Sequence, residues 1–118
     1  MAALGFVCDG RVYFAGDTDV FDQMADLGPI DTALLPVWGW GTSLGSGHMD
    51  PAAAAEAAAL IRPRTAVPIH WGTYFPVHLG RQGHPLLRDP PHDFARLVGE
   101  QARDIRVVVP AVGERVAL

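Results

Sequence analysis

The chain has 118 residues, a net charge of −4 and a hydrophobic fraction of 49%, which together indicate a single globular domain with a usable core. The acidic balance and the lack of a basic cluster exclude the usual electrostatic surface of a nucleic-acid-binding protein, and no apolar run approaches the roughly 20 residues that cross a bilayer. Because the sequence shows no secretory signal pattern and has one cysteine, Cys8, we expect a cytoplasmic protein without an internal disulfide.

The first expected element is a β-hairpin. Apolar runs at residues 4–8 and 11–15 flank Asp9-Gly10, and an Asp-Gly pair between apolar runs favours a two-residue hairpin turn. Because the second run is entirely apolar or aromatic from Val12 onwards, we expect the second strand to be buried on both faces of the sheet.

A short helix and a strand are expected after the hairpin. Residues 20–27 carry apolar side chains at helical spacing, Asp19 is a suitable N-cap, and a Gly-Pro pair ends the helix. Residues 31–37 are nearly all apolar, which predicts a central strand. This strand is expected to end near Pro36, since proline has no amide donor for the sheet.

A strand, helix and strand unit comes next. Asp50 is a good N-cap, Pro51 suits the first helical turn, and residues 52–61 are almost all alanine, the best helix former. Residues 65–70 are expected to form the following strand. The succession of strand 31–37, helix and strand predicts a right-handed parallel crossover.

The carboxyl-terminal part is expected to begin with a long connection. Residues 71–91 are rich in proline and glycine, and long connections of this kind are usually functional or mobile segments. A helix with apolar side chains on one side is expected to follow from Pro91. Residues 106–109 and 115–118 are expected to form a strand and a short closing strand.

Two strand ends carry side chains that can bind a metal ion. Asp17 follows the strand at 11–15, and His70 ends the strand at 65–70. In open α/β sheets, ligands gather beyond the carboxyl ends of the strands, and carboxylate and imidazole are ordinary zinc ligands. Taken alone, each residue also fits a structural role, Asp17 within a turn and His70 bonded to nearby backbone.

A glycine-rich loop offers a third candidate. Residues 38–49 follow a strand and contain His48, which lies immediately before the expected helix. A loop in this position is expected to form a wall of the site, although a solvated histidine fits the same place. His78, His84 and His92 are expected to have no role in the site.

The order of the motifs is more specific than any one of them. The chain contains, in this order, Tyr-Phe-Ala-Gly-Asp-Thr at 13–18, Asp-Thr-Ala-Leu-Leu-Pro-Val at 31–37, Gly-His-Met-Asp-Pro at 47–51 and Val-Pro-Ile-His-Trp-Gly-Thr at 67–73. This order resembles the carboxyl-terminal half of the metallo-β-lactamase superfamily. It is most similar to the branch of ascorbate phosphate lactonases and N-acyl phosphatidylethanolamine phospholipases D, and the resemblance covers residues 6–75.

The resemblance implies a fold and a set of residue roles. Residues 1–118 would form one α/β domain, half of the αββα sandwich, with a mixed sheet and helices on one face. Asp17 matches the family's aspartate that bridges two metal ions, His70 matches the last histidine ligand, and His48 matches a histidine near the substrate. The implied chemistry is hydrolysis of a small-molecule ester or phosphoester by metal-bound hydroxide, with one or two zinc ions.

The sequence departs from the family in one large respect, because the His-x-His-x-Asp-His motif does not occur in it. Asp17 and His70 alone fall short of the three protein ligands that catalytic zinc takes. We expect a partner, either a second copy in a homodimer or an amino-terminal half, to supply the others and to cover the apolar face that half a sandwich exposes. The chain is therefore not expected to persist as a monomer.

Two alternatives of other classes remain. The chain is a non-catalytic interaction module if it keeps the half-fold without supporting turnover, and the missing motif favours that alternative. A nucleotide-binding βα domain is disfavoured, since no glycine-rich phosphate loop opens a helix after the first strand.

Overall fold

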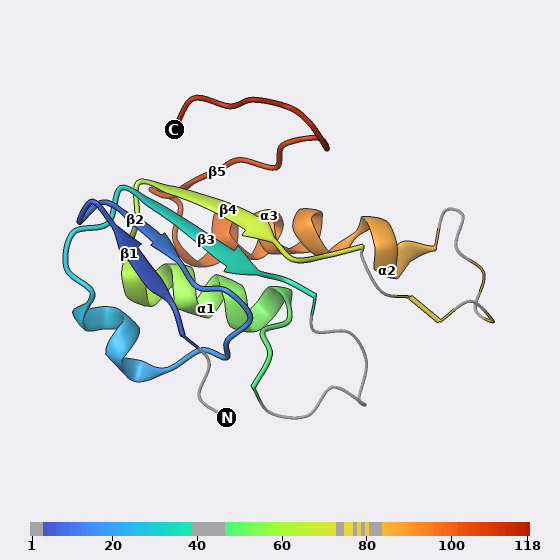
Figure 1. The fold of residues 1–118 in the computed structure, drawn as a ribbon, viewed down its shortest axis with the longest axis horizontal. Helices are drawn as coiled ribbons and strands as arrows, with labels where there is room; N and C mark the ends of the chain where they lie inside the picture. The colour runs from blue at the N-terminus through green and yellow to red at the C-terminus, as the bar shows by residue number, and fades with distance from the viewer. Residues whose placement is uncertain (1–3, 39–46, 73–74, 77, 79, 81–83) are drawn as a thin grey trace.

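A mixed β-sheet with helices packed against it forms the structure (Figure 1). The computed structural model describes residues 4–38, 47–72, 75–76, 78, 80 and 84–118. The elements, in chain order, are β1 (Phe6–Cys8), β2 (Val12–Phe14), the 3-10 helix η1 (Asp22–Asp26), β3 (Thr32–Pro36), α1 (Pro51–Ile61), β4 (Thr65–Ile69), α2 (Pro85–Arg88), α3 (Pro90–Gln101) and β5 (Arg106–Val107). The expected α/β class is confirmed.

The sheet has the strand order β1-β2-β3-β4-β5 in the described part of the chain. β1 pairs with β2 in antiparallel orientation, whereas β2, β3, β4 and β5 run parallel to their neighbours. The parallel crossover from β3 through α1 to β4 is therefore confirmed. Because β2, β3 and β4 are parallel, their carboxyl ends meet at one edge of the sheet, where ligands gather in folds of this type.

The hairpin turn between β1 and β2 is confirmed at Asp9-Gly10. Both residues have a positive φ, 52° and 62° respectively, as the central pair of a type I′ turn requires. The Arg11 N–H donates to the Cys8 carbonyl over 3.0 Å and closes the turn. Cys8 then lies opposite Val12, so the turn chemistry sets the register of the two strands.

The two faces of β2 differ in burial, so the expectation that both are buried is wrong. Tyr13 is 2% exposed and belongs to the core shared with α1 and α3, and this burial raises the pKa of its phenol. Phe14 points to the opposite face and is 41% exposed. The cause is that the helices cover only the face that carries Tyr13.

The expected helix over residues 20–27 is a shorter 3-10 helix, η1. Phe21 precedes it in an extended conformation, with φ −146° and ψ 150°, so the helix cannot begin at Val20. Asp19 does not cap it, because the Asp19 side chain accepts a hydrogen bond from the adjacent Val20 N–H instead. Met24, which is fully buried, anchors η1 in the core.

α1 begins and ends where the sequence signals predict. Asp50 Oδ1 accepts a hydrogen bond from the Ala53 N–H over 2.8 Å, Pro51 occupies the first turn, and Arg62 ends the helix in the left-handed region with φ 53°. Small side chains let α1 pack against β3 and α3; its buried alanines are Ala54, Ala55, Ala57 and Ala58. The start of α1 is thereby fixed in place.

The carboxyl-terminal region differs from expectation in two ways. The predicted connection over 71–91 contains α2, and α3 begins within it at Pro90. β5 is short, and the predicted closing strand at 115–118 is not a strand. The bonding to β4 ends at Val108, whose N–H donates to the Ala66 carbonyl over 3.0 Å, and Pro110 has no amide donor to continue the ladder. The chain turns at residues 111–114, where the Glu114 N–H donates to the Ala111 carbonyl, but no strand follows the turn. Among the described residues, none of the helices has the length and apolarity to cross a bilayer.

The sheet face opposite the helices is only partly covered. At β4, Val67 is 7% exposed, and the segment around Pro110 passes over it. At β1 and β2 the same face is open, with Phe6 58% and Phe14 41% exposed. A groove of about 650 Å³ lies beside the covered part, lined by Leu34, Val67, Pro68, Ile69, His70, Trp71, Gly72, Leu87, Pro110, Ala111 and Val112. We refer to the whole sheet face opposite the helices, which includes Phe6 and Phe14, as the open face.

Candidate metal centre

Three segments that leave the sheet at one edge carry the candidate residues. Asp17 follows β2, His48 lies between β3 and α1, and His70 directly follows β4. The ends of β3 and β4 are tied together, because the Val37 N–H donates to the Ile69 carbonyl over 3.0 Å. Residues far apart in sequence therefore meet at this edge.

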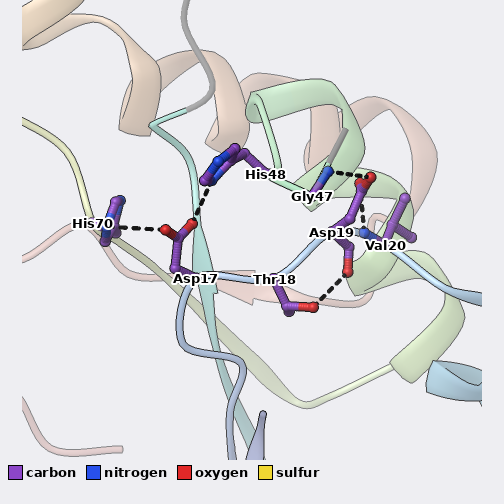
Figure 2. A network of polar contacts seen from close by, with 7 residues as sticks. All are labelled: Asp17, Thr18, Asp19, Val20, Gly47, His48 and His70. Atoms are coloured by element: carbon purple, nitrogen blue, oxygen red, sulfur yellow. Dashed lines mark hydrogen bonds and ion pairs between the residues drawn. The ribbon is translucent and has the colours of Figure 1, made fainter. Parts of the chain in front are cut away.

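The Asp17 carboxylate lies between two histidine rings (Figure 2). Its Oδ1 is 2.9 Å from His48 Nδ1, and its Oδ2 is 3.9 Å from His70 Nε2. The side chains of Asp17, His48 and His70 are 45%, 40% and 47% exposed, so the cluster is open to a ligand. The structure thus brings together all three residues that the sequence motifs singled out.

His70 is held in an unusual backbone conformation. Its φ is 62°, in the left-handed region that costs a residue with a side chain roughly 1–2 kcal/mol. Strain of this kind persists where the surrounding structure imposes it, frequently at functional sites. The tie between β4 and β3 fixes the chain just before His70, and the ring points toward Asp17 (Figure 2).

The role of Asp19 was not evident from the sequence. Its Oδ1 accepts a hydrogen bond from the Val20 N–H over 2.8 Å, and its Oδ2 accepts one from the Gly47 N–H over 3.2 Å (Figure 2). This second contact joins the segment after β2 to the residue preceding His48. Because 28 positions separate the two partners, no local sequence pattern indicates the contact.

The donor atoms of Asp17 and His70 lie somewhat farther apart than two ligands of one tetrahedral zinc ion. With bonds of about 2.0–2.2 Å, two such ligand atoms are roughly 3.3–3.6 Å apart. The separation between Oδ2 and Nε2 is 3.9 Å, so a shared zinc ion would require the two side chains to approach by a few tenths of an ångström. Within the described ranges, no group of three or more His, Cys, Asp and Glu side chains is placed to hold a metal ion. The pair offers two potential donors, fewer than the three protein ligands that catalytic zinc takes.

His84 caps the start of α2. Its Nδ1 accepts a hydrogen bond from the Leu86 N–H over 3.2 Å. Its ring lies 4.7 Å from that of Phe75. The expected loop wall of the site falls mainly on residues 39–46, which lie outside the described residues.

Comparison with known proteins identifies the family. A model of the beta-lactamase superfamily domain matches residues 2–71, more than half of the chain. The chain therefore belongs to the metallo-β-lactamase superfamily. Over 111 residues it is 40% identical to a UPF0173 metal-dependent hydrolase of Thermococcus kodakarensis, an alignment that covers 91% of this chain and 41% of that protein.

Two solved structures share the fold. Igni18, a novel metallo hydrolase from Ignicoccus hospitalis, is 34% identical with a TM-score of 0.65, over 90% of this chain and 40% of its own. A proposed Zn-dependent hydrolase of the metallo-β-lactamase superfamily from Thermotoga maritima is 25% identical with a TM-score of 0.55, over 89% of this chain and 55% of its own. These matches confirm the expected metallo-β-lactamase architecture. The chain spans less than half the length of the Thermococcus and Ignicoccus relatives.

Proposed function

We propose that this chain forms part of a metal-dependent hydrolase that acts on a small-molecule ester or phosphoester. The observation that carries the proposal is the Asp17 carboxylate facing His48 on one oxygen and His70 on the other. The hydrolase class is supported by the Thermococcus and Ignicoccus relatives, which are named as metal-dependent or metallo hydrolases.

Within the site, Asp17 and His70 hold zinc and His48 contacts the substrate. Zinc, when bound, lowers the pKa of water and polarises the bond to be cleaved. The oxygen of Asp17 that does not face His70 holds the His48 ring in one orientation through Nδ1. The opposite edge of that ring, which carries Nε2, is then available to hydrogen-bond a substrate oxygen.

The remaining metal ligands come from a partner that covers the open face. Support comes from the two-donor set of the described residues, which is below the three protein ligands that catalytic zinc takes, and from the exposed Phe6 and Phe14 on the same face. The partner is a second copy of the chain or a polypeptide that carries the family's amino-terminal half.

The substrate class rests on the Gly47–Pro51 motif, which resembles that of the ascorbate phosphate lactonase and N-acyl phosphatidylethanolamine phospholipase D branch. His48 is the residue of this motif that lies at the Asp17 carboxylate. We place the protein in the cytoplasm, in keeping with its single cysteine.

Zinc-dependent turnover by the assembled protein tests the proposal. The chain is assayed with p-nitrophenyl acetate and bis(p-nitrophenyl) phosphate, with added ZnCl2 and with a chelator. Turnover that needs zinc and disappears in both Asp17→Asn and His70→Ala is expected. Zinc-dependent turnover that survives either substitution would rule out these residues as the metal ligands.

A specific observation favours the second candidate, the non-catalytic interaction module. No described group of side chains reaches three potential metal ligands, whereas apolar side chains at β1 and β2 are exposed. An assembly that forms through the open face but binds no zinc and hydrolyses neither ester would support the module and not the enzyme.

A further inference from the structure

We infer that Asp19 is a positioning residue that holds His48 against Asp17; this inference deepens the proposed function and rests on it. Asp19 Oδ2 accepts the Gly47 N–H over 3.2 Å, and Gly47 directly precedes His48 (Figure 2). Two residues earlier on the same segment, Asp17 Oδ1 lies 2.9 Å from His48 Nδ1. One short segment after β2 therefore holds both the backbone before His48 and the ring of His48.

Aspartate side chains hold the backbone on both sides of His48 by hydrogen bonds. Gly47 has a φ of 107°, a conformation that residues with a side chain rarely adopt, and its amide is held by Asp19. On the other side, Asp50 caps α1 through the Ala53 N–H. With both neighbours held, rotation about its own side-chain bonds is the main freedom left to His48, and Asp17 restricts that rotation.

The segment of residues 17–19, which contacts Gly47 and His48, is partly buried and hydrogen-bonded within itself. Thr18 lies between the two aspartates and is 8% exposed, and its hydroxyl donates to the Asp19 carbonyl over 3.2 Å. The Asp19 carboxylate uses both oxygens as acceptors, Oδ1 for the adjacent Val20 N–H and Oδ2 for Gly47. An asparagine side chain offers a single oxygen acceptor and one amino group, which cannot accept.

This difference in acceptors defines an isosteric test. Asp19→Asn is expected to keep the shorter bond to the adjacent Val20 and to lose the bond to Gly47. Asp50→Asn is the matched control, because it removes the same charge close to the site but keeps the one acceptor that Asp50 uses as N-cap. Asp19→Ala removes both acceptors and tests the same contact if the asparagine reorients.

The readouts are NMR spectra of the zinc-free chain. In Asp19→Asn and Asp19→Ala, we expect hydrogen exchange of the Gly47 amide to accelerate by roughly tenfold or more, as loss of a bond to a charged acceptor predicts. We also expect the ring ¹⁵N resonances of His48 to shift, because the Nδ1 contact with Asp17 weakens. In Asp50→Asn both signals are expected to stay at their wild-type values. A purely structural role would change the thermal midpoint without moving the His48 ring signals.

Two outcomes would overturn the inference. One is an unchanged His48 ring spectrum in both Asp19 variants, whatever happens to Gly47. The other is an equal shift in Asp50→Asn, which would assign the effect to lost charge. Zinc titration keeps the two proposals apart: zinc binding that is unchanged in Asp17→Asn and His70→Ala contradicts the proposed function, while the spectra of the zinc-free chain still decide the role of Asp19.

Discussion

Asp17 Oδ1 and His48 Nδ1 lie 2.9 Å apart, although 31 positions separate the two residues in the sequence. The other oxygen of the same carboxylate faces His70. Asp17 thus connects a proposed substrate-contacting ring to a proposed metal ligand. Substitution of either histidine is therefore expected to lower the zinc affinity of the site, by a larger factor for His70 than for His48.

The zinc affinities of single histidine variants test this difference. His70→Ala removes a ligand and is expected to abolish binding at the site. His48→Ala removes the group that orients Asp17 and is expected to weaken zinc binding by about 10–100-fold, the usual effect of losing a partner of a metal ligand. Isothermal titration calorimetry with ZnCl2 measures both. His92→Ala, at an exposed position on α3, is the control and should bind like wild type. Equal affinities of His48→Ala and wild type would contradict the assigned role of His48.

The left-handed backbone of His70 predicts a conflict between stability and metal binding. His70→Gly relieves the cost of φ 62°, whereas His70→Ala keeps it. We expect the glycine variant to have a free energy of unfolding about 1 kcal/mol higher than the alanine variant, measured by urea denaturation, while both lose zinc. An alanine variant as stable as the glycine variant would show that position 70 is not strained.

Gly5 is predicted to be required by the packing of Tyr13. A Cβ atom at Gly5 would lie 2.7 Å from the Tyr13 hydroxyl and 2.8 Å from its ring, and Tyr13 is buried. Gly5→Ala is therefore expected to destabilise the fold by about 1–3 kcal/mol, as overpacking does. Gly99→Ala in α3 meets no neighbouring atom within 4 Å and is expected to stabilise by roughly 0.5–1 kcal/mol. Thermal unfolding compares the two variants. Destabilisation by both to the same extent would contradict this account.

The open face is predicted to mediate assembly. Phe6 and Phe14 lie opposite each other on β1 and β2 and are exposed. Replacing both by serine is expected to weaken self-association at least about tenfold, since each large apolar side chain contributes on the order of 1.5–3 kcal/mol when buried. Phe21→Ser is the control, because Phe21 is also 41% exposed but lies outside the sheet. Analytical ultracentrifugation measures the association, and a wild-type chain that is monomeric at micromolar concentration would contradict the prediction.

Local signals in the sequence were sufficient to predict several elements. The Asp9-Gly10 turn and the Asp50-Pro51 start of α1 depend on residues within a few positions of each other, and both predictions are confirmed. The metallo-β-lactamase architecture followed from the order of motifs. The strand ends beside Asp17 and His70 were predicted from the apolar runs that precede these residues.

Other features depend on contacts that short-range patterns do not encode. The prediction of a helix over residues 20–27 with Asp19 as its N-cap was wrong. The Asp19 side chain accepts hydrogen bonds from the N–H groups of Val20 and of distant Gly47 and does not cap a helix. The half-exposed β2 depends on which face the helices cover. In both cases a partner far along the chain decided the outcome. The closing strand predicted at 115–118 after the Gly113-Glu114 turn is not a strand.

The most direct test of the central claim, that Asp17 and His70 are metal ligands, is native mass spectrometry of the purified chain after addition of ZnCl2. It reports the assembly and the bound metal together. The account predicts an assembled species that carries zinc, and loss of that zinc in Asp17→Asn and in His70→Ala. The same zinc content in the wild type and in the two variants would contradict it. A wild-type species without zinc would instead place the remaining ligands on a polypeptide that carries the family's amino-terminal half.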